Sequence, residues 1–280
     1  MTTTAPPQAQ TGPTSQVEHV TPNQAERWLA DDNISNRNIR EHRVAAYARD
    51  MTAGRWMFNG ESLKFDIDGV LLDGQHRLAA VARSGVTAPF VVVRGLPPEA
   101  QDTVDIGAAR TMADALSLRG EPGAAALAAI ARRIVRWERG VTTQGGAGYV
   151  TPAEVLVYIE DHPELRRAVQ VAQMSRGAVP AAPSAVASAY HLCASLDVPG
   201  AERFYVDQLI KSVGLQEGDP ALALQRKLQR AMNSDGRQMH PDDAFRFAVL
   251  AWNHFRAGTR ISKLQAPKGG WTAANIPIPK

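Results

Sequence analysis

The sequence predicts an α+β protein in which a small mixed-sheet domain is followed by an all-helical domain. Strand patterns, with alternating or continuous apolar residues, are concentrated between residues 61 and 96, among helical patterns. From about residue 97 the β signals fade, and apolar residues recur at the spacing of amphipathic helices. The predicted segments are a disordered tail (1–17), the mixed-sheet domain (18–111), the helical domain (112–262) and an irregular C-terminal tail (263–280).

Length and composition fit two soluble domains. The chain has 280 residues, of which 44% are hydrophobic, enough for a sizeable core. The formal net charge is only +3, so attraction to nucleic acid would have to come from local clusters of basic residues. The single cysteine, Cys193, cannot form an internal disulfide, and the sequence carries neither a signal-peptide pattern nor a membrane-spanning one. We expect a cytoplasmic protein with no membrane partner and a buried, unreactive Cys193.

Two helices are expected to open the first domain. In the first helix, Thr21 is predicted to be the N-cap, Pro22 to occupy the first helical position and Gln24 to complete a capping box. The second helix is predicted to stop at Gly54. Its apolar residues recur at i, i+3, i+4 and i+7, which indicates an amphipathic helix. They are Val44, Tyr47, Ala48 and Met51.

The rest of the first domain is predicted to be a hairpin, a helix and a further strand. Alternation places Leu63, Phe65 and Ile67 on one face of the hairpin. Gly85 is expected to end the helix. The last strand is a continuous apolar run, the pattern of a strand covered on both faces. The expected ranges are 63–67 and 70–72 for the hairpin, 76–85 for the helix and 89–96 for the last strand.

The second domain is predicted to be helical. Within residues 120–140, apolar side chains such as Leu127 and Ile134 share one side of a helix. A capping box formed by Thr151 and Glu154 is expected to start the next helix. The remaining predictions are helices at 201–214, 221–233 and 241–258, with Trp252 and Phe255 of the last in the core.

The stretch "LLDGQHRLAA" carries polar residues where the hairpin meets the next helix. Such a junction collects backbone N–H groups and the positive end of a helix dipole, which suits an anion such as phosphate. Gly74 would let the backbone approach the anion closely, Arg77 could hold phosphate oxygens, and His76 could donate or transfer a proton. Asp73 could bind a Mg²⁺ ion carried by the phosphates. The alternative is a structural turn, with Asp73 as a helix cap and Arg77 solvated.

The order of these motifs, from "NISNRNIREHR" through "DGQHR" to "PFVVVRG", resembles the ParB/sulfiredoxin superfamily. The form "DGQHR" is most like the DGQHR and DndB-like branch and ParB-like proteins of phages and mobile elements. The resemblance covers 18–111 and implies a sulfiredoxin-like fold that binds a nucleoside triphosphate, ATP or CTP, together with Mg²⁺. Carried over by position, the nucleotide-binding residues are Asn36, Arg37, Gly74, Gln75, His76 and Arg77.

Departures from the family pattern and a flanking segment bear on the chemistry. ParB clamps carry Gly-Glu-Arg-Arg, so Gln75 and His76 leave the choice of nucleotide open. The box lacks the cysteine that sulfiredoxin chemistry needs, which excludes that activity. In "DTVDIGAART", Asp105 and Arg110 could bind metal, activate a hydroxyl group or close over phosphates, or could merely form a helix cap and a surface charge. The candidate catalytic residues are Asp73, His76 and Asp105, with Arg110 added to the nucleotide-binding residues and Asp73 the metal ligand.

A stripe of arginines is the candidate nucleic-acid surface. Arg132, Arg136 and Arg139 share one side of the predicted helix at 120–140, where they could lie along phosphates or simply be solvated. We expect a ParB-like nucleotide-binding protein that couples triphosphate binding to DNA or partner binding through its helical domain. The alternative is an enzyme, an NTPase, an NTP-dependent phosphotransferase or a DNA-modification factor. Double-stranded DNA and a second copy of the chain are left open as partners.

Overall fold

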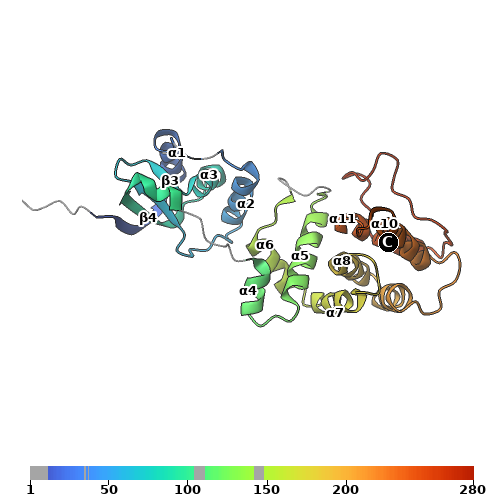
Figure 1. Cartoon of the computed structure of the whole chain (residues 1–280). Coiled ribbons are helices and arrows are strands. Elements are labelled where there is room, and N and C mark those ends of the chain that lie inside the picture. Colours follow the sequence, from blue (N-terminus) through green and yellow to red (C-terminus); the bar gives the residue numbers. More distant parts are fainter. Residues whose placement is uncertain (1–11, 35, 37, 104–110, 142–147) are drawn as a thin grey trace, which may run out of the picture. The chain divides into compact units, whose positions relative to one another are not determined.

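The computed structural model describes residues 12–34, 36, 38–103, 111–141 and 148–280. The chain divides into two compact units, residues 1–109 and 110–280 (Figure 1). Within the described ranges, all strands lie in the first unit and form one small mixed sheet, while the second unit is built from helices. The predicted class, α+β with a small mixed sheet and many helices, is confirmed. None of the described helices combines the length and the hydropathy that crossing a bilayer requires.

The sheet of the first unit has the strand order β1-β4-β2-β3. The strand β4 pairs antiparallel with β1 and parallel with β2, and β2 pairs antiparallel with β3. The helices α1, α2 and α3 pack together and share one apolar core with the sheet (Figure 1). The strands are β1 (Thr14–Val20), β2 (Ser62–Asp66), β3 (Leu71–Asp73) and β4 (Ala88–Leu96). The helices are α1 (Pro22–Asp31), α2 (Glu41–Thr52), α3 (Gln75–Ser84) and the short 3₁₀ helix η1 (Pro98–Thr103).

The strand β1 corrects the prediction of a disordered tail over residues 1–17. It pairs with β4 along its whole length, and Arg94 on β4 forms an ion pair with Glu18. Its sequence, TSQVEHV, holds only two apolar residues, and one of them, Val17, is 56% exposed. The backbone hydrogen bonds with β4 therefore make this segment a strand, although its sequence has no apolar pattern. The rest of the predicted tail, residues 1–11, lies outside the described residues.

The hairpin differs from the prediction at its turn. Ile67 is 68% exposed because β2 ends one residue earlier, at Asp66. The carboxylate of Asp66 accepts hydrogen bonds from the backbone N–H groups of Asp68 (2.9 Å) and Val70 (2.8 Å) and so closes the turn. On β4, residues alternate between buried and half-buried positions, so only one face of this strand is fully covered instead of both.

Helix ends in the first unit follow the sequence signals. The hydroxyl of Thr21 accepts a hydrogen bond from the N–H of Gln24 (3.3 Å) and caps α1, but the described contacts lack the reciprocal bond from the Gln24 side chain, so the predicted capping box is only half formed. Gly85 ends α3 with a φ of 70°, in the left-handed region that favours glycine. Val44 and Met51 of α2 are buried, as their spacing predicts.

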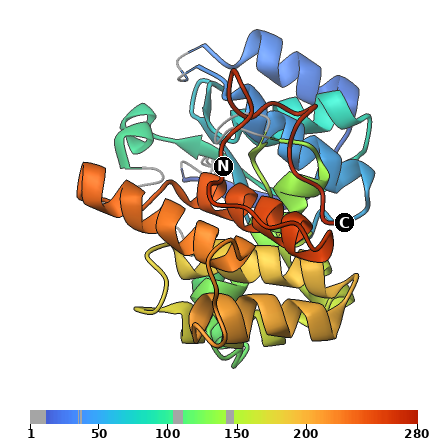
Figure 2. The same cartoon turned by 90° about the vertical axis from the view of Figure 1, so that its right-hand side faces the viewer.

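The second unit is a stack of helices around a single apolar core (Figure 2). Thr151 and Glu154 form the predicted reciprocal capping box at the start of α6. Trp252 is fully buried, which confirms its predicted place in the core. The elements are α4 (Met112–Leu118), α5 (Ala124–Glu138), α6 (Pro152–Asp161), α7 (Leu165–Ser175), α8 (Pro183–Ala194), α9 (Val198–Ala201), the π-helix η3 (Glu202–Ile210), α10 (Pro220–Asp235) and α11 (Pro241–Arg256).

The C-terminal segment 263–280 has no helix or strand, as predicted, yet it packs on the helices. The indole N–H of Trp137 donates to the carbonyl oxygen of Pro277 (3.4 Å), and that of Trp252 donates to the carbonyl oxygen of Lys280 (3.2 Å). The end of the chain, drawn in red, therefore lies beside α11 (Figure 2).

Candidate functional site

Gly74 is the N-cap residue of α3, at the strand-to-helix junction that the sequence singles out. Its φ of 110° lies in a region that L-residues with side chains rarely adopt. A Cβ atom added at this position would lie 2.4 Å from Cδ2 of Leu63 on β2. The junction therefore requires glycine for two reasons, because the backbone conformation is left-handed and because β2 lies directly against it.

Asp73 and Arg77 form an ion pair that joins β3 to α3. The Asp73 Oδ2 atom accepts from the guanidinium of Arg77 (3.0 Å) and from Nζ of Lys64 (3.1 Å). Among the described residues no side chain caps α3. The structural-turn alternative is wrong in two details, since Asp73 pairs with cations instead of capping α3 and the Arg77 side chain is only 16% exposed, while its third detail, Gly74 in the turn, is present.

The guanidinium of Arg77 has further partners on β2 and just before it. It donates to the carbonyl oxygen of Ser62 (2.6 Å) and to a carboxylate oxygen of Glu61 (3.2 Å). Its buried Nε–H has no hydrogen-bond acceptor within the described part of the chain. Arg77 is thus oriented by the sheet while one of its donors remains unused.

His76 is almost fully buried and holds the backbone that leads into α2. Its Nε2 atom accepts a hydrogen bond from the N–H of Arg40 (3.0 Å), the residue that precedes α2. An accepting Nε2 places the proton of the neutral ring on Nδ1. His76 therefore contributes to the packing of α2 against α3, a role that the sequence does not reveal.

The segment before α2 covers the outer edge of β3. The N–H of Leu71 donates to the carbonyl oxygen of Asp32 (2.8 Å), and the Asn36 side-chain amide donates back to the carbonyl oxygen of Leu71. The same amide donates to Oδ1 of Asn33 (2.8 Å), whose own amide donates to Oε1 of Gln75 (3.4 Å). Asn36 of the upstream motif and Gln75 of the "DGQHR" motif, distant in sequence, are thus linked through Asn33 at one edge of the sheet.

Three candidate residues of the nucleotide site, Arg37, Asp105 and Arg110, lie outside the described residues. Of the others, Asp73 is the predicted Mg²⁺ ligand, and two cations share its Oδ2 atom. A Mg²⁺ ion would have to compete with both cations for this carboxylate.

The predicted arginine stripe on α5 is not uniformly exposed. Arg136 pairs with Asp242 (3.3 Å) and Arg139 with the buried Glu154 (2.7 Å), so acidic side chains already neutralise both cations. Arg132 is exposed and carries the remaining charge of the stripe. The nucleic-acid surface stays a prediction, and Arg132 is its exposed residue that pairs with no acidic side chain of the described residues.

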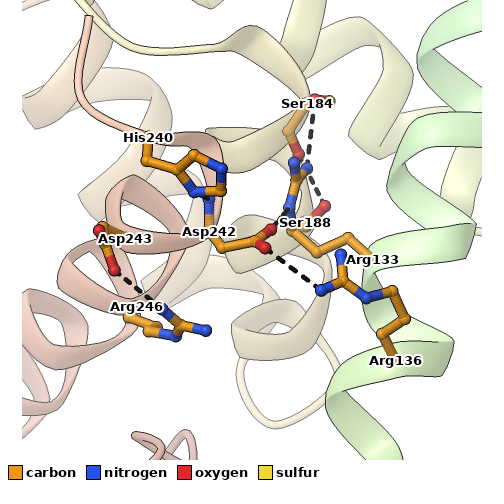
Figure 3. A network of polar contacts seen from close by, with 8 residues as sticks. All are labelled: Arg133, Arg136, Ser184, Ser188, His240, Asp242, Asp243 and Arg246. Carbon is orange, nitrogen blue, oxygen red and sulfur yellow. Dashed lines mark hydrogen bonds and ion pairs between the residues drawn. The ribbon is translucent and has the colours of Figure 1, made fainter. Parts of the chain in front are cut away.

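Asp242 at the start of α11 lies between two arginines of α5 (Figure 3). Its Oδ1 atom accepts from Nε of Arg133 and its Oδ2 atom from Arg136, both at 3.3 Å. Arg133 also donates to the hydroxyl of Ser184 on α8 (3.2 Å). Burial alone would raise the pKa of Asp242, but attraction to Arg136 and Arg133 outweighs this effect and lowers the pKa. The network ties α5, α8 and α11 together.

A second basic group lines a groove of about 730 Å³ in the helical unit. Lys227 and Arg230 of α10 lie on one side, and Lys263 of the C-terminal segment joins them. Nζ of Lys227 also lies 4.8 Å from the ring centre of Phe247. Lys263 belongs to a segment without helical periodicity, so the sequence does not reveal that it lies near Lys227 and Arg230.

Cys193, the cysteine of the helical unit, is buried. Burial raises the pKa of its thiol to about 12, so no thiolate forms near neutral pH. Its Sγ atom lies 3.3 Å from the hydroxyl oxygen of Tyr205. The expectation of an unreactive core residue fits these contacts.

Comparisons of the chain with protein-family models, with curated proteins and with solved structures find no match. The resemblance to the ParB/sulfiredoxin superfamily therefore rests on the sequence motifs, and its functional implications remain predictions. The contacts that bear on these functional predictions are those at the N-terminus of α3 and those of the arginines on α5.

Proposed function

We propose that the first unit is a ParB/sulfiredoxin-like domain that binds a nucleoside triphosphate at the N-terminus of α3. In this proposal the helical unit binds DNA or a protein partner in response. The observation that carries the proposal is the chain of side-chain hydrogen bonds from Asn36 through Asn33 to Gln75. It brings together the two motifs that the family uses to hold phosphates.

The chemistry of the junction favours an anionic ligand. The N-terminus of α3 has no side-chain cap among the described residues, and a helix N-terminus attracts negative charge. Gly74 adds no side chain that would keep a phosphate from the backbone. Arg77 is held in place by Asp73 and Glu61, and none of the described residues provides an acceptor for its buried Nε–H. In the bound state, phosphate oxygens would accept hydrogen bonds from the Arg77 guanidinium in place of the Asp73 and Glu61 carboxylates.

The contacts of the candidate catalytic residues favour binding over group transfer. His76 would act as a proton-transfer group in a phosphotransferase, but its Nε2 atom already accepts from Arg40 and the ring is almost fully buried. Asp73 would bind metal or activate a hydroxyl group, but it is paired with Lys64 and Arg77. We therefore rank the nucleotide-binding regulator above the enzyme.

Replacing Arg77 with alanine is expected to weaken triphosphate binding about 10- to 100-fold, the loss that follows from removing a charged hydrogen-bond donor. Isothermal titration with ATP, CTP, GTP and UTP, each with Mg²⁺ and with or without double-stranded DNA, measures this loss. Arg83→Ala removes the same charge from the other end of α3 and is expected to leave the affinity unchanged. Arg77→Lys, which can keep the ion pair with Asp73, is expected to bind with intermediate affinity.

The nucleotide titration also separates the two functions. A single preferred nucleotide whose affinity rises with DNA supports the coupled regulator, and DNA-insensitive phosphate release supports the enzyme. Binding by the wild-type chain that Arg77→Ala leaves intact, with an unchanged circular dichroism spectrum, would contradict the site. Absence of any triphosphate binding would contradict the proposal itself.

Arg132→Glu is expected to weaken DNA binding and to reduce the slope of log K against log salt concentration by about one, because one phosphate contact is lost. Arg132 is the suitable test residue because Arg136 and Arg139 pair with acidic side chains, and replacing them would disturb the fold. The control is Arg176→Glu, the same charge change at an exposed site just after α7. Equal salt slopes for the two variants would remove α5 from the DNA surface.

A further inference from the structure

Two histidines and a glutamate of the helical unit lie together. His162 is the C-cap residue of α6, Glu164 the N-cap residue of α7, and His191 lies in α8. Each offers one ligand atom, and these atoms all lie within 4.8 Å of one another. The Nδ1 atom of His162 is 2.9 Å from Oε1 of Glu164, and the rings of His162 and His191 meet edge to face at 5.8 Å. Three elements thus bring their metal-binding groups to one point.

We infer that His162, Glu164 and His191 form a binding site for a Zn²⁺ ion. Two imidazoles and one carboxylate are a protein ligand set of tetrahedral zinc sites in which a water molecule takes the fourth position. His162 is 37% and Glu164 56% exposed, so solvent can reach that position.

The geometry needs only a small adjustment to hold the ion. Zinc takes nitrogen and oxygen ligands at about 2.0–2.2 Å, which places tetrahedral ligand atoms about 3.4 Å apart. The ligand atoms start within 4.8 Å, and the two exposed side chains can rotate toward the third. Imidazole is a poor ligand for Mg²⁺, so the site would discriminate against that ion.

The surroundings hold the histidines in place. The ring of Tyr158 stacks on that of His162 at 4.2 Å and meets His191 at 6.4 Å. The Tyr158 hydroxyl donates to Glu138 (3.3 Å), and burial together with this carboxylate raises its pKa, so it stays protonated and is not a competing ligand. The His191 side chain forms no hydrogen bond with any residue that the structure describes. A buried imidazole without such a partner is available to a metal ion.

The test is isothermal titration of the full chain with Zn²⁺, using protein made without a histidine tag and stripped of metal by a chelator. We expect one Zn²⁺ per chain, bound equally well in millimolar Mg²⁺. His162→Ala and Glu164→Gln are expected to weaken binding more than about tenfold, since each removes one of three ligands. Both side chains are partly exposed, so both variants are expected to fold, whereas His191→Ala also opens a space in the core.

Matched controls identify the site. His254→Ala on α11 and Glu160→Gln on α6 remove the same groups elsewhere in the helical unit and are expected to leave zinc affinity within about twofold, as independent sites do. Loss of binding in the ligand variants alone supports the site. Absence of tight one-to-one binding by the wild-type chain, or equal losses in ligand and control variants, would overturn it.

Discussion

Replacing Asp242 with alanine is expected to lower the free energy of unfolding by about 3–5 kcal/mol, the cost of removing one partner from a buried ion pair. Asp242 is the shared acceptor of Arg133 and Arg136, and the side chains of all three are at most 13% exposed. Without the carboxylate, two guanidinium groups would face each other across a space shielded from water (Figure 3). Urea denaturation followed by circular dichroism measures the loss.

The neighbouring residue provides the control. Asp243→Ala removes a carboxylate that is 39% exposed and pairs with Arg246, so its expected cost is only about 0–1 kcal/mol. Asp242→Asn keeps the shape but not the charge, and is expected to fall between the two alanine variants. If Asp242→Ala and Asp243→Ala cost the same, the network of Figure 3 would not stabilise the helical unit.

The pH dependence of the same comparison follows from the lowered pKa of Asp242. A carboxyl group whose folded-state pKa lies below its unfolded value stabilises the protein above the unfolded pKa, about 4, and loses this contribution as the pH falls further. The difference in stability between wild type and Asp242→Ala should therefore be constant near neutral pH and shrink below about pH 4. If the difference in stability between wild type and Asp242→Ala instead grew as the pH fell, folding would raise the pKa of Asp242, and the prediction would be wrong.

The elements that could be predicted from the sequence are those with a local signal. Caps such as Thr21 and Thr151, and helical spacing such as that of Val44 and Met51, act within one or two turns. The strand β1 has no such signal, because its partner β4 lies far along the chain and supplies mainly backbone hydrogen bonds. β-Propensity alone cannot reveal a strand whose formation depends on pairing with the edge of a strand far along the chain.

The residues of the candidate site likewise fall into two groups: those with a local sequence signal and those whose contacts come from distant parts of the chain. A contiguous motif, "DGQHR", marks the α3 junction, and the requirement for Gly74 there fits the motif. The partner of His76, the backbone of Arg40, is a tertiary contact that no spacing encodes. The arginines of α5 form a regular stripe in the sequence, yet Asp242, which pairs with Arg136, follows more than a hundred residues later. Long-range ion pairs are therefore what turns a basic stripe into a structural network.

Gly74→Ala is expected to lower the free energy of unfolding of the first unit by about 2–4 kcal/mol, from backbone strain and overpacking together. The φ of 110° suits glycine, and the new methyl group would start 2.4 Å from Cδ2 of Leu63, which is fully buried in the core. Leu63 cannot move away without disturbing the packing around β2. The same urea experiment measures the loss.

Gly85→Ala at the other end of α3 separates the two causes of this loss. Gly85 also has a positive φ, 70°, but nothing lies within 4 Å of its would-be Cβ atom. Its substitution should therefore cost only the conformational part, about 1 kcal/mol. The difference between Gly74→Ala and Gly85→Ala then measures the contact with Leu63, and in Gly74→Ala/Leu63→Ala that contact is absent, so the combined loss should be smaller than the sum of the single losses. Strict additivity, or equal losses at the two glycines, would mean that the junction tolerates a side chain and that β2 does not require glycine at this position.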